Sequence, residues 1–364
     1  MKSVYTYLSE VEDFRIEKKC LHKLSDILLI GLLTYLSNGE DYEDMVLFGN
    51  THEKFLTEFI PLEHGIPSHD TFNRVFSVLE PDLLRSCLIN YGKDILSVLS
   101  EKQICLDGKK LRGNSPASRG NKGLYIVNAW VAENRICIGQ KKVDDKSNEI
   151  TAIPSLIEEL DIEDAVISID AIGCQRDIAN QITNKKGHYL LALKQNQEEL
   201  YNDVATGFKA CSPENVNEDW EYDHGRYEVR KCSIIKSADA LLEETGKQWP
   251  TVKTLIMVQA SRMIHNEQTT EVRYYISDEE NQSAAYFNAL VRGHWGIENH
   301  LHWHLDITFK EDACRARKGY APENLSTLRK IALQIIKEQD DKLSLKKRRL
   351  KAAYDIQYLK KLVT

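Results

Sequence analysis

The sequence predicts an α/β protein in which helices cover both faces of a mixed sheet, with a small all-helical N-terminal domain and a β-rich insertion. Three observations lead to this prediction. Apolar residues recur at helical spacing over residues 1–95, short apolar runs alternate with helical stretches over 96–335, and β-branched and aromatic residues fill about 198–285. We therefore expect an N-terminal helical domain, a central α/β domain with its insertion, and a basic C-terminal tail at 336–364.

The N-terminal domain is expected to contain helices that each carry apolar residues on one side. Their expected ranges are 21–36, 42–59, a short helix capped by Ser68 or Asp70, and 82–100 after Pro81. Such a set of helices fits a DNA-binding module and fits simple packing equally well. Both interpretations stay open on the residues alone.

The central domain begins with a meander of strands and continues with alternating helices and strands. The expected strands are 104–108, 124–132, 135–143, 165–173 and 188–194, and the expected helices are 150–160 and 174–183. The later strands are almost entirely apolar, which is typical of strands buried on both faces. Two strands deliver an aspartate near their C-terminal ends, Asp107 and Asp170, where α/β sheets bind ligands.

Composition and charge limit the functional class. The 364 residues are 42% hydrophobic and 28% charged, with a net charge of −7, which describes an ordinary soluble protein. The apolar run 27–36 is too short to cross a bilayer and the N-terminus lacks a signal-peptide pattern, so we expect a cytoplasmic protein. Eight lysines and arginines against one acid in 342–364, and five against one in 107–123, suit a polyanionic partner, although a solvated helix face fits the tail equally well.

The stretch 291–317, VRGHWGIENHLHWHLDITFKEDACRAR, contains a third acid of interest. If this stretch is helical, one face presents His294, Glu298 and His302 beside Leu301 and Leu305. A salt-bridged amphipathic helix explains this pattern without any chemistry. The histidines at 300, 302 and 304 suggest zinc only weakly, because His302 would point away from the other two.

Asp107, Asp170 and Glu298 together form the candidate catalytic site. Three converging carboxylates repel one another unless divalent cations lie between them, and oxygen ligands favour Mg²⁺ or Mn²⁺. Two such ions can activate an attacking oxygen and stabilise a leaving oxygen in phosphoryl transfer. Asp107 could instead belong to an ordinary Asp-Gly turn. Basic residues that could contact a phosphate backbone near this site are Lys109, Lys110, Arg112, His224, Arg226 and Arg230.

Several ordered blocks give the chain a resemblance to a known family. They are LDGKKLRGN (106–114), KSNEITAIPSLIEELDIEDAVISIDAIGCQRDIANQI (146–182), HYLLALKQNQ (188–197), DHGRYEVR (223–230) and HWGIENHLHWHLDITFKEDACRAR (294–317). These resemble a bacterial insertion-sequence transposase of the DDE type, in the group that includes the H-repeat-associated proteins. GIPSHDTFNRVFSVLEP (65–81) and SLKKRRLKAAYDIQYLKKL (344–362) resemble its N-terminal associated domain and its C-terminal segment.

The resemblance implies an RNase H-like fold and a DNA transposase. It implies that Asp107, Asp170 and Glu298 bind two Mg²⁺ or Mn²⁺ ions, and that the enzyme cuts element ends and joins their 3′-hydroxyls to target DNA. It further implies a homodimer on DNA, with no membrane and no small-molecule substrate as partner.

The chain departs from the wider superfamily around the glutamate, where the pattern is Y-x2-R-x3-E-x6-K. Val291, His294 and Leu305 occupy the Tyr, Arg and Lys positions. The expected phosphate contacts are therefore Arg292, His294, Trp295, Arg315 and Arg317. Three alternative functions stay open: a catalytically inactive DNA-binding derivative of such an element, a two-metal nuclease, and a metabolic metal-dependent hydrolase.

Overall fold

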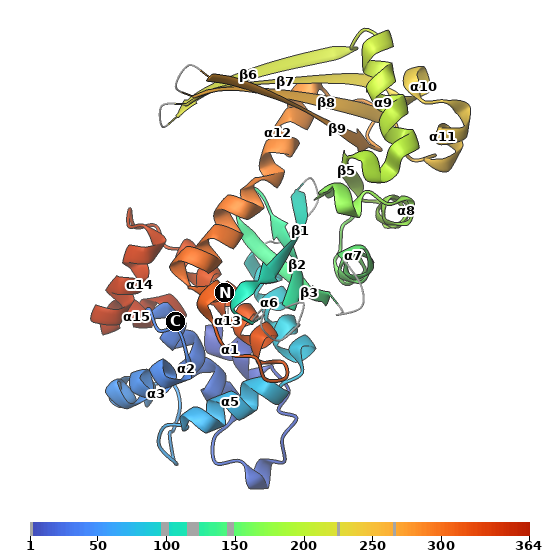
Figure 1. Cartoon of the computed structure of the whole chain (residues 1–364). Helices are drawn as coiled ribbons and strands as arrows, with labels where there is room; N and C mark the ends of the chain where they lie inside the picture. The colour runs from blue at the N-terminus through green and yellow to red at the C-terminus, as the bar shows by residue number, and fades with distance from the viewer. Residues whose placement is uncertain (1–2, 96–101, 115–123, 144–148, 224–225, 265–266) are drawn as a thin grey trace.

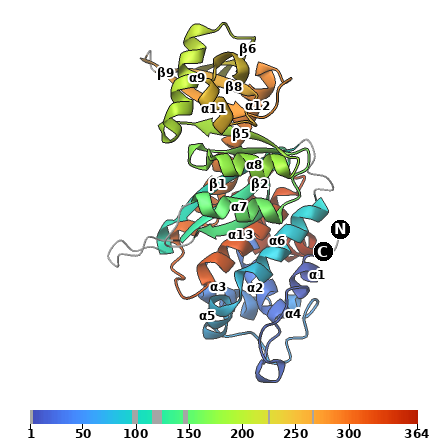
Figure 2. The ribbon, with the colours of Figure 1, turned by 90° about the vertical axis from the view of Figure 1, so that its right-hand side faces the viewer.

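A computed structural model describes residues 3–95, 102–114, 124–143, 149–223, 226–264 and 267–364. The molecule is elongated. A helical body at one end holds both termini, a β-sheet occupies the middle, and further strands extend this sheet at the other end (Figures 1 and 2). The predicted mixed α/β architecture with a helical N-terminal region is confirmed.

The N-terminal region folds into short helices around an apolar centre. They are α1 (Val4–Ser9), α2 (Leu24–Leu36), α3 (Tyr42–Thr51), α4 (Glu53–Leu56), α5 (His69–Val78) and α6 (Pro81–Ile95). The hydroxyl of Ser68 caps α5 by accepting a hydrogen bond from the Thr71 amide, as predicted. The single helix expected over 42–59 is wrong: His52, with φ −113° and ψ 25°, leaves the helical region and separates α3 from α4.

The C-terminal segment folds back onto these helices. α13 (Ala321–Lys337) is buried along almost its whole length, and α14 (Leu345–Tyr354) and α15 (Ile356–Val363) follow it. Apolar residues of both chain ends share one hydrophobic cluster. Arg348 and Arg349 of the expected basic tail point inward: the Arg349 guanidinium donates to the carbonyls of Tyr35, Gly39 and Thr308 and lies 4.3 Å from the centre of the Phe309 ring.

The sheet has the strand order β3-β2-β1-β4-β5-β9-β8-β7-β6 among the described residues. Its strands are β1 (Gln103–Leu111), β2 (Leu124–Val131), β3 (Ile136–Val143), β4 (Val166–Ile169), β5 (His188–Leu193), β6 (Asn215–Asp223), β7 (Arg226–Lys236), β8 (Thr254–Ile264) and β9 (Glu267–Ser277). β1, β4 and β5 are parallel, and the other pairings are antiparallel. The insertion therefore continues the main sheet, because β9 pairs directly with β5.

Helices cover both faces of this sheet. α7 (Glu149–Glu159), α8 (Arg176–Asn184) and α9 (Glu198–Ala210) pack on one face, while α6, α12 (Ala284–His294) and α13 pack on the other. The insertion is less uniformly β than expected, since it opens with α9 and contains α10 (Ser237–Ala240) and α11 (Glu243–Gln248). No described helix is both long enough and apolar enough to cross a membrane.

The close contact between α5 and the start of α13 yields a stability prediction. Gly319 has φ +50°, and a Cβ there would lie 2.1 Å from the Ser77 carbonyl oxygen of α5. Gly65 has φ +69° but nothing within 4 Å of the corresponding position. Gly319→Ala should lower the free energy of unfolding by roughly 2–4 kcal/mol and Gly65→Ala by only about 1 kcal/mol, because Gly65→Ala adds backbone strain without a clash. Urea unfolding of both variants checks this, and equal losses would contradict the described contact.

Candidate metal centre

Two aspartates meet because of the register between parallel strands. Leu106 of β1 pairs with Ile169, the last residue of β4. The residues that follow these two are Asp107, still in β1, and Asp170, just after β4. β1 continues to Leu111, beyond the predicted end at residue 108, because it stays paired with β2 past Asp107, which lies opposite Asn128. Asp170 caps a short 3-10 turn, and its carboxylate accepts a hydrogen bond of 3.2 Å from the Ile172 amide.

The third acid stands on an irregular helix. After α12 ends, the chain continues in π-helical turns over Glu298–His302 and His304–Thr308. π-Helical turns are rare and are often found at functional sites. Leu301 and Leu305 face the interior and are buried, as predicted, while Glu298 remains exposed beside Asp107.

The structure brings Asp107 and Glu298 together with a histidine that the sequence reasoning had not assigned to the site. One donor atom each from Asp107, Glu298 and His302 lies within 4.8 Å of the other two. The His302 Nδ1 atom is 3.5 Å from Asp107 Oδ2 and 3.4 Å from Glu298 Oε2. Asp170 is not a member of this group among the described residues, but its charge acts on Asp107.

The surroundings of Asp107 oppose the charged form of its carboxyl group. Burial, followed by the charges of Glu298, Asp170 and Glu149, raises the pKa of Asp107 to about 8. Such a carboxyl group is largely protonated at neutral pH until a cation takes the place of the proton.

Glu149, the first residue of α7, is a fourth acid that the sequence reasoning overlooked. Its carboxylate lies over Gly108, where a Cβ would come within 2.2 Å of Oε1. Burial and the charge of Asp170 raise the pKa of Glu149 to about 7. In the sequence, the KSNEI block (146–150) places Glu149 at the start of a predicted helix. The spacing between Glu149 and Asp107 does not by itself indicate that the two acids meet.

These residues fit a divalent cation. Carboxylate oxygens with one imidazole nitrogen form a donor set for Mg²⁺, Mn²⁺ or a related ion. The neighbouring lysine does not neutralise them: Lys109 is buried, and its Nζ atom donates to Asp306 at 2.5 Å and to Glu311 at 2.6 Å. Lys109 is therefore internal, and its predicted contact with DNA finds no support in its position.

The other predicted phosphate contacts are distributed unevenly. Lys110, Arg112 and Arg315 are exposed, whereas Arg230 lies half-buried beside Glu228 and the Arg292 guanidinium donates to Glu221 at 2.5 Å. Trp295 is exposed, and the Arg273 guanidinium carbon lies 4.7 Å from the centre of its ring. His224 and the side chain of Arg226 lie outside the described residues.

His294 also faces inward. One ring nitrogen is 3.0 Å from the Ser168 hydroxyl of β4, and burial lowers the pKa of this histidine to about 4. A neutral imidazole at this position does not replace the positive charge of the superfamily's arginine.

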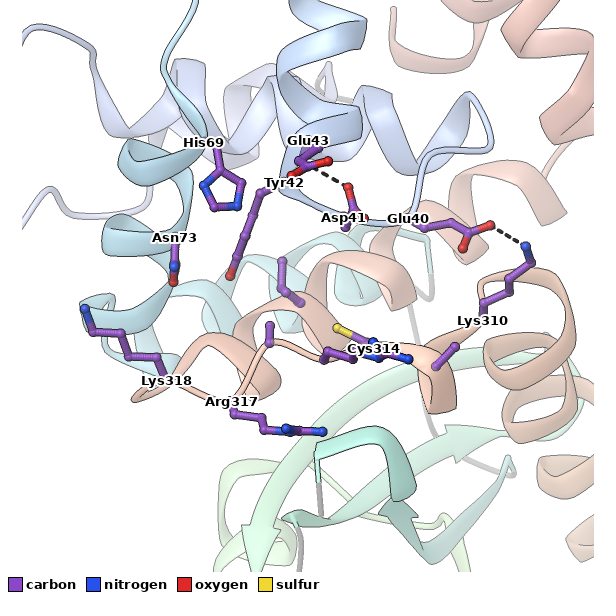
Figure 3. A pocket seen from close by; sticks show the side chains of 14 residues that line it. Glu40, Asp41, Tyr42, Glu43, His69, Asn73, Lys310, Cys314, Arg317 and Lys318 are labelled. Carbon is purple, nitrogen blue, oxygen red and sulfur yellow. Dashed lines mark hydrogen bonds and ion pairs between the residues drawn. The ribbon is translucent and has the colours of Figure 1, made fainter. Parts of the chain in front are cut away.

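A cavity of about 620 Å³ lies between the N-terminal helices and the segment that follows the Glu298 helix. Figure 3 shows Arg317 and Lys318 along one side of it, and Glu43, Tyr42 and His69 along the other. The Arg317 guanidinium donates to the carbonyl of Gly113, just beyond β1, at 3.1 Å. The basic side of the cavity therefore begins close to the strand that carries Asp107.

Comparisons with known proteins agree on one family. A family profile for the transposase DDE domain matches residues 99–335, and one described as DDE_Tnp_1-associated matches residues 5–92. The "H repeat-associated putative transposase YhhI" of Escherichia coli K12 is 38% identical over 99% of this chain and 97% of its own. A protein of Xanthobacter autotrophicus named for the dhlA 3′ region is 41% identical over 71% of this chain and 88% of its own. The "Inactive transposase YbfQ" of E. coli K12 is 43% identical over 21% of this chain and 92% of its own.

The raised pKa of Asp107 predicts how the metal-free protein responds to pH. Because the folded-state pKa of about 8 exceeds the ordinary 3.8, the stability linked to this group is complete below pH 4 and is lost as pH rises toward 8. In excess EDTA, Asp107→Asn should gain about 1–3 kcal/mol of unfolding free energy relative to wild type between pH 5.5 and pH 8.

Urea unfolding at the two pH values measures this effect. Mn²⁺ at pH 8 should stabilise the wild type and leave the variant unchanged, while Glu163→Gln, which removes an exposed acid far from the site, should follow the wild type throughout. Identical pH dependence of wild type and Asp107→Asn would contradict the electrostatic account.

Proposed function

The chain belongs to the DDE transposase family, and we propose that it cuts DNA at the ends of an insertion sequence and joins the 3′-hydroxyl ends to a target. The observation on which this proposal rests is the convergence of Asp107 and Asp170 through the β1–β4 register, with Glu298 brought to the same place by its helix. The family uses divalent metal ions. We assign Asp107, Asp170 and Glu298 as the residues that hold two Mg²⁺ or Mn²⁺ ions.

Bound ions of this kind would polarise the scissile phosphate, activate the attacking oxygen and stabilise the leaving oxygen. The protein's own task is to hold the acids in place. Asp107 is fixed by pairing with β2 and by the β4 pairing that ends at the preceding residue. Asp170 is fixed by its turn, and Glu298 by a helix anchored through buried Leu301 and Leu305. Acids held in this way keep the geometry needed for an in-line displacement before DNA arrives.

DNA would reach the site across the basic residues at its border. Lys110 and Arg112 follow Asp107 on the same strand and turn, and Arg315, Arg317 and Lys318 line the cavity next to Gly113. These exposed cations suit phosphates, whose neutralisation releases counterions and makes binding salt-dependent. The paired Arg292 and Arg230 would first have to leave Glu221 and Glu228. A homodimer that holds two DNA ends, and residence in the cytoplasm, also belong to this proposal.

An inactive DNA-binding derivative and a two-metal nuclease are the alternatives. One relative is named an inactive transposase, but it corresponds to only 21% of this chain. Here all three acids are present: Asp107 lies beside Glu298, and Asp170 follows Ile169, which pairs with Leu106, and this arrangement supports the proposal of an active enzyme. A nuclease would leave free ends, whereas a transposase also joins them to another duplex, so the reaction products separate the two functions.

Removal of any one acid should abolish the chemistry without abolishing DNA binding. We expect Asp107→Asn, Asp170→Asn and Glu298→Gln each to lower strand cleavage of cognate end DNA in Mg²⁺ by at least about a thousandfold, with DNA affinity changed less than about threefold. The remote variant Glu163→Gln should cleave like wild type. A gel assay for cleavage and joining, with affinity measured in parallel, tests this, and full cleavage by any variant of the three acids would refute the assignment.

The cationic side chains at the cavity border should affect the affinity for DNA and not the binding of metal. Arg315→Ala combined with Arg317→Ala should weaken DNA binding and reduce the slope of log K against log salt by about 1–2, because each lost phosphate contact removes about 0.9 from that slope. Mn²⁺ affinity should stay unchanged. Lys247→Ala, at an exposed lysine on α11 far from the site, should leave the slope intact. An unaltered slope in the double variant would place the DNA elsewhere.

A further inference from the structure

We infer that His302 is a metal ligand of this site, so that one cation is held by an imidazole nitrogen together with the carboxylates of Asp107 and Glu298. This inference rests on the proposed function, because it assumes that the acids hold cations. It goes further by assigning a fourth ligand to the centre and by predicting its metal preference. A ligand set with one nitrogen and carboxylate oxygens favours Mn²⁺ over Mg²⁺, because Mg²⁺ takes oxygen ligands almost exclusively.

The position of the ring is the first support. His302 is 3% exposed, and its Nδ1 atom lies 3.5 Å from Asp107 Oδ2 and 3.4 Å from Glu298 Oε2. Both separations are longer than the roughly 2.7–2.9 Å that is typical of a charge-assisted N–H···O hydrogen bond. Octahedral ligands about 2.1 Å from an ion lie about 3 Å apart, so the imidazole nitrogen needs to approach each carboxylate oxygen by only about half an ångström.

The second support is the partner of the other ring nitrogen. Nε2 lies 3.3 Å from the side-chain nitrogen of Asn128, which is fully buried on β2 opposite Asp107. The Oδ1 atom of the same amide has no hydrogen-bond donor among the described residues, an expensive condition for a buried carbonyl. Turned toward the ring, this oxygen accepts the Nε2 hydrogen and leaves the Nδ1 lone pair facing the two acids. Metal-binding histidines commonly donate their second nitrogen in this way.

The helix supplies the third support because, of His300, His302 and His304, it turns His302 toward the acids and the other two elsewhere. His300 stacks on Trp130 with ring centres 6.3 Å apart, and His304 lies 3.2 Å from the Thr308 hydroxyl. His302 closes the π-helical turn that Glu298 opens, and both side chains consequently reach Asp107. The neighbouring His300 therefore provides a matched control on the same helix.

Electron paramagnetic resonance of bound Mn²⁺ tests the inference on the full-length protein without DNA. Electron spin-echo modulation from directly coordinated ¹⁴N should appear in the wild type, change to the ¹⁵N pattern after labelling with ¹⁵N-histidine, and disappear in His302→Gln. Mn²⁺ affinity should fall about 10- to 100-fold in this variant, at least as much as on loss of an outer-shell partner. Mg²⁺ affinity should change less. His300→Gln should retain the modulation and the affinity.

Absence of nitrogen modulation in the wild type would overturn the inference, as would its persistence in His302→Gln. If that variant does not fold, the ¹⁵N-labelled wild type still decides. A different result would refute the proposed function. If both Asp107→Asn and Glu298→Gln still bind Mn²⁺, these acids do not form the metal centre. Loss of binding in those two variants, with no nitrogen coupling in the wild type, would refute only the role of His302.

Discussion

The buried ion pair between Lys109 and Glu311 holds the two halves of the site together. Lys109 lies on β1 two residues beyond Asp107, and Glu311, which is 1% exposed, follows the helix that carries Glu298. Burial opposes ionisation of Glu311, but the charges of Lys109, Lys330 and Arg329 outweigh it and lower its pKa to about 2. Removing one member of such a pair leaves an uncompensated buried charge, which typically costs about 3–5 kcal/mol. The strand and the helix therefore cannot separate without a large loss in stability.

Asp107 and Glu149 are arranged in the opposite way, with too little positive charge near them. Burial and mutual repulsion raise the pKa of Asp107 and of Glu149, while the nearest lysine is committed to Asp306 and Glu311. The carboxylates of Asp306 and Glu311 are paired with the protein's own lysine, whereas Asp107 and Glu149 are left for the cation that we propose. This division explains how a cluster of repelling acids can be built into a stable sheet.

Much of this architecture could be predicted from periodicity, and what could not depends on register and on side-chain direction. Apolar spacing located strands β1–β5 and helices α2 and α5–α8, but helices α9–α11 and α13–α15 were not predicted. Two aspartates near strand ends indicated the edge where we propose that metal binds. The sequence could not indicate that β1 continues to Leu111 beyond Asp107, because this extension depends on pairing with β2. On a regular helix His302 shares a face with Glu298, but the sequence could not show that this face meets Asp107 or that His302 is buried beside both acids. The inward direction of Lys109 and Arg349 depends on partners about 200 and 310 residues away, which no local pattern encodes.

The shared cluster of the two chain ends has a consequence for synthesis on the ribosome. Apolar residues of α2 pack against α13 and α14, so α2 lacks part of its interior until these two helices have been translated. A shortened reading frame would leave this apolar surface exposed to chaperones and proteases. Frameshifted copies of such a gene should therefore yield little protein, instead of a stable fragment that binds DNA and competes with the intact chain.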